Sequence, residues 1–441
     1  MDTGSCEGEG VDGKRRMIDR FSNLPDHVAH HILSFLTISH LARFGCVSRR
    51  CRELYLSAPF LNIDELPRLS DAKCSKLQRW LNCMDRFFFL RGNNKIQRLR
   101  VCWMSHFVDV SESDSDGHVD DDDEDDDETL CSCDEYFRMM SWIHNAVRCN
   151  VEELDLDIGP GEAIAPVFPS SVFLCRSLTS LSVDLGPIVL HVPSFAFSSN
   201  LKYLKLKSGI VEQGFSKWIS CWCKCIEELT LDGIHIRDTT IESSSLKKFS
   251  FVGDNLTDTV DIRGDKLEEI VIDWLLHSPR EKSLNINAPS LKYLSWKGNL
   301  MESRNIGKLE FLEEAAILLK PEVDGSSDVL EVLSSLCRVK VLSINEATIK
   351  ACGFNMGYWK MQNFAFIHQL KEVSIELSHG TNGVELIRCF EFFCSLRKAK
   401  LLFVKEPTIR VCYRQALRKG SMAAALDDAS SLRIHIERFV D

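Results

Sequence analysis

Apolar residues recur in one short pattern through the larger part of the chain. The pattern is an apolar residue, two residues of any kind, an apolar residue, one of any kind and a third apolar residue. Clear copies, such as "LKYLKL" and "LEEIVI", begin at Val151, Leu178, Leu201, Ile226, Leu246, Leu267 and Leu291. Because side chains alternate along a strand, we expect the fourth and sixth residues of each copy to be buried. The third, fifth and seventh should point outward.

The copies are spaced regularly enough to form a repeat. The first eight begin 20 to 27 residues apart, which is the leucine-rich-repeat period. Weaker copies begin at Leu312, Val339, Leu370 and Leu396, and the segment from Ile96 fits an early copy. In such a fold the parallel strands stack, and each repeat covers the apolar face of its neighbour. The pattern therefore predicts an α/β fold with an irregular leucine-rich-repeat solenoid and a curved parallel sheet. Unrelated strands in separate α/β units are the alternative.

Residues 18–60 show a second pattern, with apolar residues at helical spacing. Pro25 suits the first turn of a helix, and Asp26 favours its positive end. The apolar positions of three successive segments are Val28, Ile32, Leu33 and Leu36, then Leu41 and Phe44, then Val47, Cys51, Leu54 and Tyr55. They predict a module of three short helices. Because about forty residues bury little surface alone, we expect an apolar face of this module to pack against something else.

Negative charge is concentrated in one segment. Residues 109–128 contain 13 Asp or Glu and no Lys or Arg, whereas the whole chain has 64 acidic and 53 basic residues. The remainder is nearly neutral, which gives no support for a nucleic-acid-binding surface. A segment of this charge density repels itself and cannot form a packed core.

The predicted division of the chain has five parts. They are a disordered tail at 1–17, the helical module at 18–60, a helical linker and first repeat at 61–108, a disordered acidic insertion at 109–133, and repeats with an irregular C-terminal part at 134–441.

Motifs for membranes, catalysis, cofactors or metals are not indicated. No apolar run approaches the ~20 residues of a membrane span, and the N-terminus has no secretory h-region. The 18 cysteines therefore suit a reducing compartment, and we expect localisation in the nucleus and/or cytoplasm.

Phosphate-binding loops and nucleophile elbows are absent. His27 and His31 have no acidic or cysteine partner placed as in a zincin helix, and the cysteines of "CWCKC" are too close for a zinc ribbon. We expect no enzyme, no cofactor and no metal site.

The helical module resembles a known family. The stretch "DRFSNLPDHVAHHILSFLTISHLARFGCVSRRCRELYLSAPFLNID" is similar to the F-box of plant F-box/leucine-rich-repeat proteins. The match covers the Leu24–Pro25 start and the segments "HHILSFL" and "CVSRRCREL". Two later stretches, "LNCMDRFFFLRGNNKIQRLRV" and "SWIHNAVRCNVEELDLDI", resemble the segments that lead into the repeats of that family. The resemblance thus spans most of the chain.

The resemblance implies partners and an interface. In that family the F-box docks on a Skp-type adaptor of a cullin–RING ubiquitin ligase, and the repeats hold a protein substrate. The implied adaptor-facing residues are Leu24, Pro25, Ile32, Leu33, Leu36, Leu41, Val47, Ser48, Arg50 and Leu54. Cys51 and Tyr55 stand where the family commonly has Trp, which would shrink the aromatic anchor of the interface.

The repeats predict a second binding surface. Their outward positions carry exposed tyrosines among charges, a composition suited to recognition of an unknown protein; an ordinary mixed strand face is the alternative. The predicted substrate-binding residues are Tyr203, Lys205, Lys207, Glu228, Asp232, Lys248, Tyr293 and Lys297. Two functions follow: a substrate-recognition adaptor of a ubiquitin ligase, or a leucine-rich-repeat interaction scaffold without ligase function.

Overall fold

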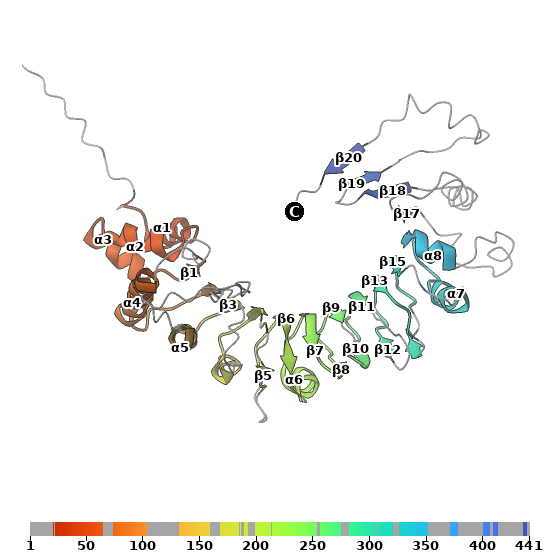
Figure 1. Ribbon diagram of the computed structural model, residues 1–441, viewed down its shortest axis with the longest axis horizontal. Helices are drawn as coiled ribbons and strands as arrows, with labels where there is room; N and C mark the ends of the chain where they lie inside the picture. The colour runs from red at the N-terminus through yellow and green to blue at the C-terminus, as the bar shows by residue number, and fades with distance from the viewer. Residues whose placement is uncertain are drawn as a thin grey trace, which may run out of the picture.

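The chain forms a curved arc that begins with a helical module and continues as a solenoid (Figure 1). The computed structural model describes residues 21, 23–64, 74–103, 132–158, 168–184, 186, 189–192, 199–212, 214–253, 256–274, 282–301, 303–307, 309–320, 326–351, 371–377, 400–405, 409–412 and 435–438. The predicted tail and most of the predicted acidic insertion lie outside these residues. Only Ser132 and Cys133 of the insertion are described, and they begin a helix.

The N-terminal module, residues 21–59, contains three short helices. They are α1 (Asp26–Leu33), α2 (Ile38–Gly45) and α3 (Arg49–Leu56). The Ser48 hydroxyl accepts a hydrogen bond from the Cys51 amide at 3.1 Å and so caps α3. A β-carbon at Gly45 would lie 2.8 Å from the Tyr55 ring, so this contact between α2 and α3 requires glycine. The buried residues of the module include Ala29, Leu33, Ile38, Leu41 and Leu54.

The main sheet runs the length of the arc. Its strands, in spatial order, are β1 (Phe60–Ile63), β2 (Arg98–Trp103), β3 (Glu153–Ile158), β4 (Ser180–Asp184), β6 (Tyr203–Val211), β7 (Glu228–His235), β9 (Lys248–Gly253), β11 (Glu269–Trp274), β13 (Tyr293–Gly298), β15 (Glu314–Leu319), β16 (Val341–Asn345), β17 (Glu372–Leu377), β18 (Lys400–Lys405), β19 (Ile409–Cys412) and β20 (His435–Arg438). Pairing is parallel from β1 to β18 and antiparallel from β18 to β20. Short β5 (Val189–Leu190) pairs with β6.

The repeat pattern correctly predicted this sheet. In β6, for example, Leu204 and Leu206 are buried, whereas Tyr203, Lys205 and Lys207 are exposed. The main sheet lines the inner, concave side of the arc in Figure 1. The α/β solenoid with a curved parallel sheet is therefore confirmed.

Helices and a second sheet form the outer side of the arc (Figure 1). The helices are α4 (Cys74–Arg91), α5 (Ser132–Arg148), α6 (Phe215–Trp222), α7 (Ser326–Ser335) and α8 (Glu346–Ala351), with a 3-10 turn at Ser170–Val172. The second sheet is parallel and contains β8 (Asp238–Glu242), β10 (Thr259–Arg263), β12 (Ser283–Asn287) and β14 (Ser303–Asn305). Apolar side chains from both layers form one continuous core.

Aromatic residues join the N-terminal module to the first repeats. The Tyr55 ring of α3 lies 4.8 Å from the Phe87 ring of α4, measured between ring centroids. Trp142 of α5 stacks on Phe88 at 5.9 Å and meets Trp103 of β2 edge-on at 6.1 Å. These rings bury large apolar areas, so the module, the linker helix and the first two repeats share one core.

A buried arginine stabilises the same junction. Arg91, at the end of α4, is only 2% exposed. One guanidinium nitrogen, Nη2, lies 3.2 Å from the carbonyl oxygens of Ala58, Asn94 and Lys95, which share its two hydrogens. Its guanidinium carbon lies 5.4 Å from the Phe87 ring centroid. Burial lowers the pKa of Arg91 to about 10, so the side chain stays charged at neutral pH. Among the described residues no carboxylate pairs with it.

Replacing Arg91 tests the importance of these hydrogen bonds. Arg91→Lys keeps a positive charge, but its side chain is shorter and lacks the nitrogen that donates to the three carbonyls. We expect it to lower the free energy of unfolding by about 1.5–3 kcal/mol, the range for hydrogen bonds to charged groups. Hydrogen–deuterium exchange of α3 and α4 measures the loss. Arg86→Lys, on the exposed face of the same helix, is the matched control. Equal protection in both variants would contradict this role.

The core of the N-terminal module gives a second prediction. Leu54 is buried among the three helices, and Leu54→Ala should cost about 2–5 kcal/mol of local stability because it leaves a cavity. Val47→Ala changes an exposed side chain and should stay within about 0.5 kcal/mol of wild type. Amide exchange across α1 to α3 in the full chain distinguishes them. Similar exchange for both variants would show that Leu54 is not a core residue.

Candidate protein-interaction surfaces

Three large apolar side chains are exposed on the N-terminal module. Phe35 is 77% exposed, Val47 75% and Ile32 44%. Ile32 lies in α1, Phe35 follows this helix, and Val47 lies between α2 and α3. Single exposed apolar residues are common on protein surfaces, but three on so small a module indicate a surface that another protein covers.

The structure divides the ten predicted adaptor-facing residues into three groups. Pro25, Ile32, Val47 and Ser48 are exposed, whereas Leu24, Leu36 and Arg50 are half-buried. Leu33, Leu41 and Leu54 are buried. The side chains of these three fill the core of the module itself. Contact with the adaptor stays a prediction for the ten residues.

Sequence reasoning missed Phe35. Phe35 lies outside the predicted helical stripe of Ile32, Leu33 and Leu36, so the pattern gave no reason to single it out. The available signal was its size, because a large aromatic side chain at a position outside the stripe must either be exposed or find another partner. The structure shows it exposed, with its ring 5.5 Å from that of His31.

Arg50 has a partner inside the module. Its guanidinium donates to the Asp26 carboxylate and lies 3.5 Å from the Leu24 carbonyl oxygen. This hydrogen bond raises the pKa of Arg50 and lowers that of Asp26. The pair connects α3 to the start of α1. Because both side chains reach solvent, the pair adds little stability, and its main effect is to orient the beginning of α1.

Cys51 and Tyr55 point inward. Cys51 is buried, and Tyr55 is half-buried against Phe87, where burial raises the pKa of its hydroxyl to about 12. Cysteine and tyrosine in place of tryptophan at these two positions therefore change the side of the module that packs against its own core and α4. The exposed side chains of Ile32, Phe35 and Val47 are unaffected by them.

The predicted substrate-binding residues all lie on the concave face. Strand pairing aligns their positions in rows that cross the sheet. One row contains Tyr203, Glu228, Lys248, Glu269, Tyr293 and Glu314. Another contains Asp184, Lys207, Asp232, Val252, Asp273 and Lys297. Lys205 lies between these rows, beside Thr230. Whether any of these residues contacts a target stays a prediction.

Most charges on the concave face pair across neighbouring strands. Lys207 lies 2.9 Å from the Asp184 carboxylate, and Lys297 lies 3.0 Å from that of Asp273. Lys248 lies 3.3 Å from Glu269 on one side and 3.9 Å from Glu228 on the other. Some charges on this face have no ion-pair partner within 4.0 Å among the described residues: Asp157, Lys205, Asp232 and Glu314.

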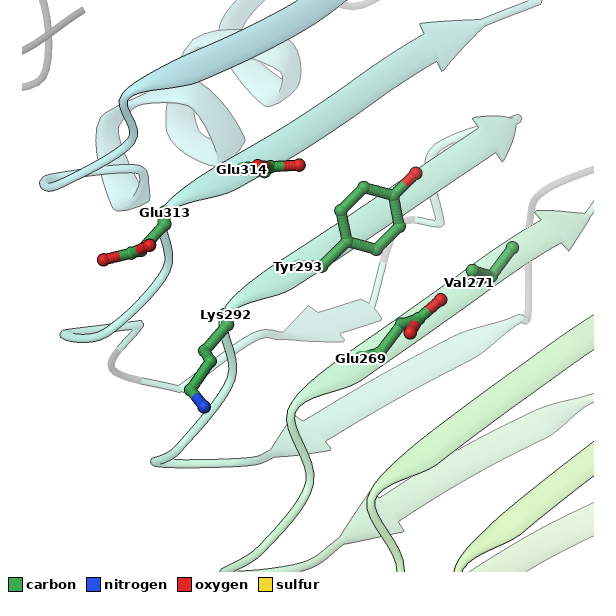
Figure 2. A pocket seen from close by; sticks show the side chains of 6 residues that line it. All are labelled: Glu269, Val271, Lys292, Tyr293, Glu313 and Glu314. Carbon is green, nitrogen blue, oxygen red and sulfur yellow. The ribbon is translucent and has the colours of Figure 1, made fainter.

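The concave face is hollowed around Tyr293. This hollow of about 410 Å³ is lined by Glu269, Val271, Lys292, Tyr293, Glu313 and Glu314. Figure 2 shows the tyrosine ring on β13 between Glu314 of β15 and the β11 residues Glu269 and Val271. A second hollow of about 400 Å³ adjoins it and shares Glu313. Sequence reasoning had singled out Tyr293 but not this hollow, because its walls come from three different repeats.

Metal and membrane sites are not evident in the described part of the chain. No group of three or more His, Cys, Asp or Glu residues there is placed to hold a metal ion. Of the thiols in "CWCKC", Cys223 is buried, which raises its pKa to about 12, whereas Cys221 and Cys225 are exposed. None of the described helices combines the length and apolar character that crossing a bilayer requires.

Comparison with known proteins identifies both parts of the arc. The F-box domain profile matches residues 21–57, and the profile for the LRR repeats of FBD-associated F-box protein At5g56370 matches residues 139–344. Among relatives from Arabidopsis thaliana, F-box/LRR-repeat protein At4g14103 is 24% identical over 76% of this chain and 80% of its own length. F-box/LRR-repeat protein At3g58900 is 28% identical over 68% of this chain and 80% of its own.

A longer match extends over 86% of this chain. It is to putative F-box/FBD/LRR-repeat protein At4g03220 of Arabidopsis thaliana, at 23% identity and over 72% of that protein. The three-helix module and the parallel repeats thus occur in the same order as the two matching profiles. The chain belongs to the plant F-box/leucine-rich-repeat proteins.

Proposed function

We propose that this chain is the substrate-recognition subunit of a Skp–cullin–F-box ubiquitin ligase. F-box/leucine-rich-repeat proteins are in general adaptors, and an F-box in general implies a Skp-type partner. The observation that carries the proposal is the exposure of Ile32, Phe35 and Val47 on the F-box of a chain that also presents a long concave sheet. One surface suits the adaptor and the other a target.

In this proposal the chain performs no chemistry itself. The F-box binds the Skp-type adaptor and, through it, the cullin and the RING protein. The repeats hold an unknown protein substrate near a ubiquitin-charged enzyme, which raises the effective concentration of the reacting groups. Because these ligase components act there, we also propose residence in the nucleus and/or cytoplasm. The inward orientation of Cys51 and Tyr55 favours this function over a scaffold without ligase partners.

Removing the exposed apolar side chains of the F-box should abolish adaptor binding. Phe35→Ala combined with Val47→Ala truncates two side chains that lie outside the core. Anchors of an interface commonly contribute about 2 kcal/mol or more each, so we expect the loss of two anchors to lower affinity for a Skp-type protein by about a thousandfold. Titration of the purified full-length chain by calorimetry measures it.

Phe89→Ala is the matched control for that experiment. Phe89 is 83% exposed, but it lies on α4 outside the F-box. Its replacement should leave adaptor affinity unchanged. If the wild-type chain shows no binding at micromolar adaptor, the ligase proposal fails and a scaffold function remains.

The concave face should bind the target. Replacing Tyr203, Lys205 and Tyr293 together with alanine removes exposed or half-buried side chains from β6 and β13 without entering the core. We expect the triple variant to lose specific partners recovered by cross-linking from native cells, while retaining the adaptor. Recovery of every partner at the wild-type level would place target binding on another surface.

A further inference from the structure

We infer that the hollow around Tyr293 binds a target segment in which a lysine or arginine stands next to an apolar residue. The inference rests on the proposed use of the concave face for target recognition, and it specifies the chemistry of the target. Three features carry it: an aromatic wall, a carboxylate with no basic partner among the described residues, and a continuation of the hollow toward an exposed phenylalanine.

The aromatic and apolar parts of the hollow provide a contact surface. Tyr293 lies at its centre, on β13, and Val271 of β11 lies on one side (Figure 2). A tyrosine buries a large area at low cost in side-chain entropy, because it has only two rotatable bonds. The ring is half-buried between two strands, so its position is largely set before a partner arrives. Tyr293 and Val271 together suit an apolar side chain of the target.

The charges around the Tyr293 ring favour a target in which a basic residue stands next to that apolar residue. Of the charged residues that line the hollow, Glu269 pairs with Lys248, Glu313 with Lys340, and Lys292 with Glu268. Glu314 is the exception, since no basic nitrogen among the described residues lies within 4.0 Å of it. Its carboxylate stands next to Tyr293 in the strand register. A lysine or arginine of the target would complete the charge pairing that the rest of this face already shows.

The hollow continues over the rim of the solenoid. The adjoining hollow shares Glu313 and is lined further by Glu310, Phe311, Leu312, Arg338 and Lys340. Phe311 is 59% exposed although it is a large aromatic residue. An extended target segment could therefore pass from Tyr293 across Glu313 to Phe311, with apolar contacts at both ends and the basic side chain between them.

Peptide libraries test the inference on the full-length chain. The probes are fluorescein-labelled degenerate decapeptides with a central Arg–Phe, compared with matched libraries containing citrulline–Phe or Glu–Phe. Citrulline keeps the shape of arginine but has no charge. We expect the Arg–Phe library to bind about three- to tenfold tighter than the Glu–Phe library, as one attractive and one repulsive exposed pair allow. The citrulline library should lie between them, and the differences should shrink with added salt.

Variants locate the effect in the hollow. Glu314→Gln should remove most of the preference for arginine over citrulline, Glu314→Lys should reverse the preference between arginine and glutamate, and Tyr293→Ala should weaken every library. Glu242→Lys makes the same charge change on β8 of the outer sheet and should leave all affinities unchanged. Equal binding of the three libraries, no binding by any, or an intact preference in Glu314→Lys would each overturn the inference.

Adaptor binding, measured on the same samples, separates this result from the proposed function. Loss of the peptide preference with normal adaptor binding would overturn only the target chemistry. A clear arginine preference in a chain that binds no adaptor would overturn the ligase function and leave the binding site standing.

Discussion

One backbone carbonyl in each repeat accepts two hydrogen bonds from the next repeat. The Pro59 carbonyl accepts from the amides of Gln97 and Arg98 at 2.8 and 3.1 Å, and Gln97 in turn accepts from Glu152 and Glu153. The same arrangement recurs at the residue before each successive strand as far as Glu313. Because a carbonyl oxygen has two lone pairs, it can hold both amides and so set the register between neighbouring strands. A slip of one residue would turn buried leucines outward.

The register explains the pairing of charges on the concave face. With the strands aligned, side chains at equivalent positions of adjacent repeats lie directly beside each other. Like charges there would repel, and the sequence places Lys207 next to Asp184 and Lys248 next to Glu269. The residues that accept the double hydrogen bonds show the same alternation, as in the pairs Glu227–Lys247 and Glu268–Lys292. Among the described residues that line the hollow at Tyr293, Glu314 departs from this pattern, since no basic nitrogen lies within 4.0 Å of its carboxylate.

The sequence predicted the repeats more completely than the sites. The sheet followed from local information, because each copy carries its own alternation of apolar and polar residues and the copies have a common period. The helices of the F-box were also predicted, but their two apolar faces could not be separated. In helices of eight residues, Leu33 and Ile32 are neighbours, yet one fills the core and the other is exposed. Which of them faces inward depends on how α1 packs against α3, and this is a tertiary property.

The hollow at Tyr293 was harder to predict from the sequence for a similar reason. Its lining comes from β11, β13 and β15 and from the residues preceding two of these strands. The outward position of Tyr293 follows from the repeat pattern alone. The pairing state of Glu314 does not, because it depends on the alignment of Glu314 with Tyr293 and Val341 in the neighbouring repeats and on how far the lysines at the strand starts reach.

The paired backbone hydrogen bonds between successive repeats also connect the two proposed surfaces. It begins at Pro59, directly after the F-box helices, and the junction is further held by Arg91 and by the rings of Tyr55, Phe87 and Trp142. A flexible linker would spread a bound target over many positions and lower its effective concentration near a ubiquitin-charged enzyme. A shared core instead gives the concave face one orientation relative to the F-box. The contacts that stabilise the junction therefore also determine where a target would be presented.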